Sequence, residues 1–161
     1  MLKIYTSYFY MVRFMKPNMI PLSTAKYAPA WFHQGKGQNF QWKDKNGVWN
    51  GLRAPEFAPG EVCEGLCHGP DDCDRHDPEL CLFLKAYRYQ LDQLDYDDII
   101  KRCEKIANHV KAHEQFEEEP IVVLLVHEAR DNPCSERKPI QDWFASHGKE
   151  VIEWNPKTLT T

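Results

Sequence analysis

The chain lacks a long apolar segment, an excess of positive charge and a recognisable secretory leader. Its longest clean apolar run, residues 121–126, is far too short to span a bilayer, so we expect no membrane partner. Residues 1–15 include Lys3 and Arg13 and contain no small-residue cleavage site, which makes the cytoplasm the expected location. The net charge of −4 gives no global basic field for nucleic acid, although local basic patches are compatible with it.

Several familiar catalytic motifs are also absent from the sequence. There is no P-loop and no glycine fingerprint of the dinucleotide-binding kind. There is no Gly-x-Ser-x-Gly elbow that would place a nucleophilic serine on a sharp turn. These absences exclude the common nucleotide-binding loops and the usual serine hydrolase arrangement, so any site must use another pattern.

What is present indicates an α/β protein. The 161 residues, of which 42% are hydrophobic, suffice for one domain with a real core. Apolar spacing predicts strands at 2–9, 18–24, 121–128 and 150–154, and helices at 78–94, 97–110 and 139–148. We therefore predict a single three-layer α/β domain over 1–161 with a mostly parallel, Rossmann-like sheet. Residues 27–81 would form an irregular aromatic- and cysteine-rich insertion within it.

A cluster of cysteines lies inside that insertion. Cys63, Cys67, Cys73 and Cys81 fall within nineteen residues, and His68 and His76 lie among them. In the cytoplasm disulfides are disfavoured, and thiolates are ligands for Zn²⁺ or for an iron–sulfur cluster. We expect the four cysteines to hold a structural zinc ion, with an iron–sulfur cluster as an alternative. A histidine replacing one cysteine, or free thiols in a surface loop, also remain open.

The strand at 121–128 leads into a short polar loop and then a helix. In open α/β sheets, ligands bind beyond the carboxyl ends of the strands, and the first amides of a helix attract anions. We therefore expect Arg137 to bind an anionic group, with Ser135 and Glu136 beside it. Glu128 is the candidate for proton transfer, and Cys134 is the candidate nucleophile or donor. The structural alternative is a helix cap at Ser135 and a local ion pair between Glu136 and Arg137.

Polar residues end the two N-terminal strands as well. Ser7 and Tyr8 close the first strand, and Ser23 closes the second. If those strands lie beside 121–128, their hydroxyl groups would line the same ligand edge. The alternative is that they are ordinary strand and turn residues.

The two ends of the chain resemble the YeaO-like family of uncharacterised proteins. The family pattern is roughly Leu-Leu-Cys-x-Glu, a spacer, Cys-His-Arg, a helix and a Gly-x-x-Val strand. The matching positions here are Leu124, Leu125, Glu128, Cys134, Arg137, Gly148 and Val151, together with the openings "IYTSYF" and "IPLSTAKY". Val126 stands where the family often has cysteine, and Cys-Ser-Glu-Arg replaces Cys-His-Arg. The resemblance implies an α/β fold with a pocket at this edge, and it implies no established reaction.

Two classes of function follow from these observations. The first is an enzyme of hydrolase or glycosidase type that binds or processes a small anionic, nucleotide-like or phosphorylated ligand, or a protein that only sequesters it. The second is a zinc-stapled module that recognises nucleic acid or a protein without catalysis. In that case residues 31–53, where tryptophans alternate with lysines, would supply the binding surface.

Overall fold

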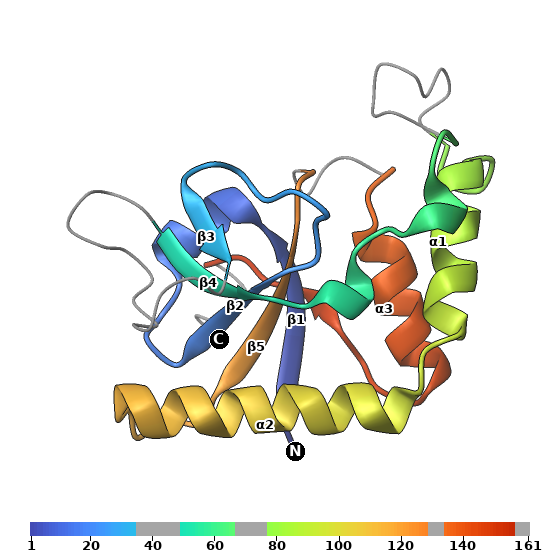
Figure 1. Ribbon diagram of the computed structural model, residues 1–161. Coiled ribbons are helices and arrows are strands. Elements are labelled where there is room, and N and C mark those ends of the chain that lie inside the picture. Colours follow the sequence, from blue (N-terminus) through green and yellow to red (C-terminus); the bar gives the residue numbers. More distant parts are fainter. Residues whose placement is uncertain (35–48, 67–76, 129–133, 157–161) are drawn as a thin grey trace.

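The computed structural model describes residues 1–34, 49–66, 77–128 and 134–156, and they form a parallel sheet with helices packed on it (Figure 1). The strands are β1 (Lys3–Tyr8), β2 (Met19–Ser23), β3 (Phe32–Gln34), β4 (Trp49–Arg53), β5 (Ile121–Val126) and β6 (Ile152–Glu153). The α-helices are α1 (Leu82–Asp92), α2 (Tyr96–Glu114) and α3 (Arg137–Ser146), and the 3₁₀ helices are η1 (Phe9–Phe14), η2 (Pro55–Phe57) and η3 (Glu61–Cys63). The predicted α/β class with a parallel sheet is confirmed.

The apolar strand β5 lies in the middle of the sheet. The strand order is β3-β4-β2-β5-β1-β6, and every pairing between these strands is parallel. Residues 122–126 are buried because both faces of β5 are covered, as its continuous apolar sequence predicts. Pro21 does not keep β2 out of the interior, since β2 pairs with β4 only from Leu22 onward. The carboxyl ends of β1, β2 and β5 therefore meet at one edge.

The two faces of the sheet carry different kinds of cover. Parallel strands are joined by right-handed crossovers, so connections that run in opposite directions across a sheet lie on opposite faces. The β4-to-β5 and β5-to-β6 connections run one way and carry all three described α-helices on one face. The β1-to-β2 and β2-to-β3 connections run the other way and cover the second face with η1 and residues 24–31.

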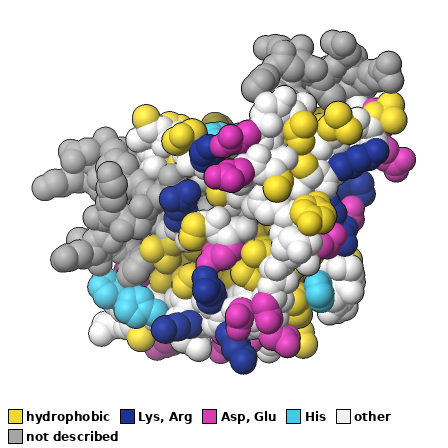
Figure 2. Space-filling model, turned by 45° about the vertical axis from the view of Figure 1, so that its right-hand side comes forward, with side chains coloured by type: hydrophobic (Ala, Val, Ile, Leu, Met, Phe, Trp, Pro, Cys, Tyr) yellow, Lys and Arg dark blue, Asp and Glu magenta, His cyan; other side chains and the backbone are white. Residues whose placement is uncertain are grey.

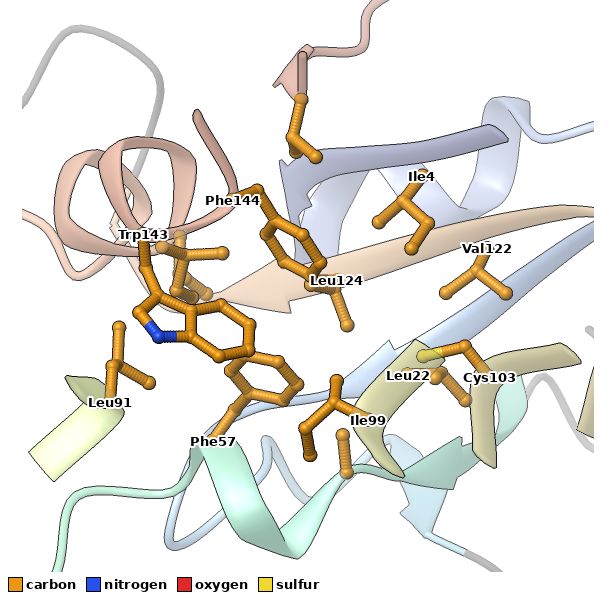
Figure 3. Packing of buried hydrophobic residues seen from close by; sticks show 14 of the residues in the cluster. Ile4, Leu22, Phe57, Leu91, Ile99, Cys103, Val122, Leu124, Trp143 and Phe144 are labelled. Carbon is orange, nitrogen blue, oxygen red and sulfur yellow. The ribbon is translucent and has the colours of Figure 1, made fainter. Parts of the chain in front are cut away.

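The larger core lies between the sheet and the α-helices. Figure 3 shows Trp143 and Phe144 of α3 meeting Phe57 of η2, with side chains of α1, α2 and the central strands around them. The Phe57 ring lies edge-on to Trp143 at 5.9 Å and stacks with Phe144 at 6.1 Å. Helix α2 crosses the sheet and presents Ile99, Cys103, Ala107 and Val110, the apolar face that its spacing predicts.

The region predicted to be an irregular insertion is partly ordered as sheet. Residues 32–34 and 49–53 add β3 and β4 to one side of the sheet, and η2 and η3 follow. The stretch 67–76, which contains much of the cysteine cluster, lies outside the described residues. None of the described helices is both long and apolar enough to cross a bilayer.

Gly51 allows β3 and β4 to approach closely. A Cβ atom at this position would lie 2.3 Å from the Phe32 ring and 2.8 Å from the carbonyl oxygen of Pro21. The Pro21 carbonyl belongs to the backbone of the adjoining strand β2, so it cannot move aside without displacing the sheet. A glycine is therefore required where β4 lies between β3 and β2.

We expect Gly51→Ala to lower the free energy of unfolding by about 1–3 kcal/mol, the usual cost of inserting a methyl group into a closely packed site. Chemical denaturation followed by tryptophan fluorescence measures this change. An unchanged midpoint would show that β2, β3 and β4 do not pack as closely as the structure has them.

Candidate functional site

The candidate site lies at the carboxyl end of β5. The chain leaves β5 toward the helical face, whereas both neighbouring strands, β1 and β2, lead into connections on the η1 face. In open α/β sheets, ligands bind beyond the strand ends at such a point of divergence. Glu128 follows β5 at this point, and residues 134–137 return the chain to the start of α3.

Arg137 connects three elements at this edge. Its Nε donates a hydrogen bond to the Glu153 carboxylate of β6 at 3.1 Å. One of its terminal nitrogens donates to the backbone carbonyl of Glu128 at 2.6 Å. The Arg137 and Glu153 side chains are only 8% and 15% exposed, so this ion pair lies in the protein interior. Arg137 therefore ties the end of β5 to α3 and β6, and its contact with a ligand anion stays a prediction.

Glu153 is held from a second direction. Thr6 of β1 donates to the same Glu153 oxygen at 2.8 Å, and Gln141 of α3 donates to the Thr6 hydroxyl oxygen at 2.7 Å. A buried carboxylate is stable only when it is both paired and hydrogen-bonded, and this network meets both conditions. The orientation of Arg137 is thus determined by residues from β1, α3 and β6.

Two carboxyl groups meet in front of this network. Ser135 donates a hydrogen bond to Glu128 at 3.2 Å, and the Arg137 amide donates to the Ser135 hydroxyl oxygen at 3.2 Å. The Glu136 carboxyl group lies beside that of Glu128. Burial of Glu136, reinforced by the neighbouring Glu128 charge, raises the pKa of Glu136 to about 8. Glu136 therefore keeps its proton at neutral pH.

Two further predicted site residues, Tyr8 and Cys134, lie next to this group in the described part of the chain. The Arg137 guanidinium carbon lies 5.9 Å from the centre of the Tyr8 ring, so Tyr8 is placed at the edge where it was expected. Cys134 is half-buried and lies one residue before Ser135. Its roles as nucleophile or donor stay predictions.

Ser7 and Ser23 lie apart from this group. Both are paired in register with Leu125, whose side chain packs on the η1 face of the sheet, and both are fully buried. The Ser7 hydroxyl donates to the Trp154 carbonyl oxygen, and the Ser23 hydroxyl accepts from the Ala25 amide. The structure therefore brings Tyr8 to the Glu128–Arg137 group but leaves the two serines on the opposite face.

Only half of the predicted metal site falls in described segments. Cys63 lies in η3 and Cys81 immediately precedes α1, and both side chains are buried. The Cys63 thiol lies 3.8 Å from the Gln90 side-chain oxygen, and burial raises its pKa. Cys67, Cys73 and the two histidines lie outside the described residues. Within the described segments no group of three or more His, Cys, Asp or Glu residues is placed to hold a metal ion. The zinc site stays a prediction.

Three residues that support the site have no recognisable signal in the sequence. Thr6, Gln141 and Glu153 come from three elements that are distant in sequence, and nothing in their local sequence indicates that they meet. A partial signal exists for Glu153, since a carboxylate at the end of a final strand would share an edge with Arg137 if β6 were parallel to β1.

Comparisons with known proteins do not assign the chain to a family. No protein-family model, curated protein sequence or solved structure matches the chain.

The buried ion pair can be tested through stability. We expect Arg137→Met to lower the free energy of unfolding by about 3–5 kcal/mol, because it removes the guanidinium that faces the buried Glu153 carboxylate. Lys138→Met is the matched control, since the Lys138–Asp142 pair is about half exposed and contributes about 0.5 kcal/mol or less. Equal effects of the two substitutions in urea denaturation would contradict the structural role of Arg137.

The raised pKa of Glu136 predicts a particular pH dependence of stability. The pKa of Glu136 rises from 4.5 to about 8 on folding, so the folded state binds more protons between these values. The contribution of Glu136 to stability is therefore complete below about pH 4.5 and is lost as pH rises to about 8. Glu136→Gln should remove this part of the decline when unfolding is measured across the range. Parallel stability curves for the two proteins would rule out the raised pKa.

Proposed function

We propose that the protein is an enzyme that binds and processes a nucleotide-like or otherwise phosphorylated ligand at the carboxyl end of β5. Glu128 and Glu136 would form its proton-transfer pair. The observation that carries this proposal is the meeting of these two carboxyl groups, one of which holds its proton at neutral pH, at the strand edge where α/β proteins bind ligands.

The environments of the two carboxyl groups favour different roles for them, one as proton donor and the other as proton acceptor. When neighbouring carboxyl groups share one proton, one of them can donate while the other accepts. The burial that holds the proton on Glu136 makes Glu136 the donor, and Glu128, which receives a hydrogen bond from Ser135, becomes the acceptor. This arrangement suits general acid–base catalysis near neutral pH.

A hydrolytic step fits this pair. Glu128 would accept a proton from a water molecule as the water oxygen bonds to the electrophilic atom of the ligand. The bond to the leaving group would break with its electron pair on that group, which would then take the proton from Glu136. The bond attacked is either a phosphoester or a glycosidic bond, since both classes are cleaved with this proton balance.

Arg137 has a positioning role in this proposal. It holds the backbone at Glu128 and is the first residue of α3, so it sets where the carboxyl pair lies. The resemblance to the YeaO-like family supports the same edge, because its matching positions include Glu128, Cys134 and Arg137. A cytoplasmic location and a structural zinc ion in the cysteine-rich segment belong to the same proposal.

The proposal is tested by incubating the protein with the common ribonucleoside mono- and diphosphates and separating the products by ion-exchange chromatography. For a nucleotide that is consumed, Glu128→Gln should lower kcat by about 100-fold or more, the usual contribution of a general base. The thermal shift caused by that nucleotide should remain, because the amide keeps the shape of the side chain.

Glu150→Gln is the matched control, because Glu150 is an exposed carboxylate that takes no part in the pair. Wild-type turnover by the Glu128→Gln protein would overturn the assignment of the base.

A further inference from the structure

The sheet face opposite the α-helices carries an exposed aromatic surface. It comprises Tyr10, Arg13 and Phe14 of η1 together with Tyr27 and Trp31 of the β2-to-β3 connection, and is called here the η1 surface. Tyr10 and Phe14 are 50% and 49% exposed, and Tyr27 is 75% exposed. These three rings are half-exposed or exposed, so they add little to the core. Exposed apolar side chains gathered on one face indicate a surface that binds a partner.

Arg13 lies between two of these rings. Its guanidinium carbon is 3.9 Å from the centre of the Tyr10 ring and 5.7 Å from that of Trp31. Its Nε also donates to the Tyr10 carbonyl oxygen at 2.8 Å, which fixes the planar group beside the Tyr10 ring. The side chain is nevertheless exposed, so a cation and a stacking surface are presented together.

The η1 surface extends to the end of β5. The buried Phe9 ring contacts Trp31 at 6.4 Å and His127 at 5.1 Å, and His127 is hydrogen-bonded to the Tyr27 carbonyl oxygen. His127 immediately precedes Glu128 at the end of β5.

The N-terminal part of the chain, which includes the η1 surface, carries positive but no negative side chains. Residues 1–43 contain six of the 20 Lys and Arg residues and none of the 24 Asp and Glu residues, although the whole chain has a net charge of −4. Lys16 and Lys26 are exposed within this stretch, and Lys26 has a 3.5 Å contact with the exposed Glu64. On the helical side, by contrast, basic and acidic side chains are interspersed (Figure 2). The exposed Arg13 and Lys16 would attract a polyanion to the η1 surface.

We infer that the η1 surface binds single-stranded nucleic acid. Bases would stack on Tyr10, Phe14 and Tyr27, and backbone phosphates would pair with Arg13 and Lys16. Exposed aromatic rings interleaved with cations are how proteins bind single strands with little sequence preference, because every base has a face to stack. A duplex would not fit this surface, since its bases are already stacked on one another. This inference does not depend on catalysis by the carboxyl pair.

Binding is measured by fluorescence anisotropy with labelled oligothymidylate and oligouridylate of about 12 nucleotides, a length within the usual site sizes for single strands. A duplex of equal length is the third probe. We expect one or both single strands to bind, and this binding should weaken steeply as salt is added. Comparing oligothymidylate with oligouridylate shows whether the ligand is DNA or RNA. The Glu128→Gln protein should bind equally well, which separates this test from that of the proposed enzyme.

Two kinds of variant test the surface itself. Tyr10→Ala and Phe14→Ala should each weaken binding by about tenfold, which is within the usual contribution of one stacked base. Tyr89→Ala is the matched control, because Tyr89 is 60% exposed on α1 and lies on the other side of the sheet. Arg13→Gln should reduce the slope of log affinity against log salt by about 0.7, as expected for one lost phosphate contact.

The inference is overturned if neither single strand binds at about 50 mM salt, the low end of the range in which phosphate contacts are strongest. It is also overturned if the duplex binds more tightly than the single strands, or if Tyr89→Ala weakens binding as much as Tyr10→Ala. Melting temperatures of the η1 variants within a few degrees of the wild type would show that losses of affinity are local.

Discussion

The buried ion pair between Arg137 and Glu153 is the interaction on which the candidate site depends. It joins the first residue of α3 to the last strand of the sheet, and the same guanidinium holds the carbonyl of Glu128 beyond β5. An ionised pair in the interior is stable only with good geometry and further hydrogen bonds, which Thr6 and Gln141 supply. The position of the carboxyl pair Glu128–Glu136 is a consequence of this arrangement.

The topology of the sheet explains why the molecule has two unlike faces. Right-handed crossovers place the helical connections on one side and the short, aromatic connections on the other. The first side brings α3 and its acidic and basic residues to the strand edge. The second side presents the η1 surface. Both meet at the end of β5, where His127 is directed to one face and Glu128 to the other.

Much of the fold could be predicted because its signals are local. The continuous apolar run 121–126 predicted a central parallel strand, and Glu128, Ser135, Glu136 and Arg137 come together because they flank one short loop. Glu153 and Thr6 could not be found this way, since their approach depends on pairing between the first and last strands. The placement of Ser7 and Ser23 was also beyond reach: strands buried on both faces have no alternating pattern to show which way each side chain points. The sequence alone shows that residues 1–43 contain no acidic residue. This absence indicates a binding surface only because the structure exposes the rings of η1 beside the basic residues.

An NMR titration of the side-chain carboxyl carbon of Glu136 tests this account of the site. The wild-type protein should show a step at about pH 8 that Glu136→Gln removes. If Glu136 instead titrates near 4.5, the ordinary value for glutamate, it does not hold its proton at neutral pH and the account of the site is wrong.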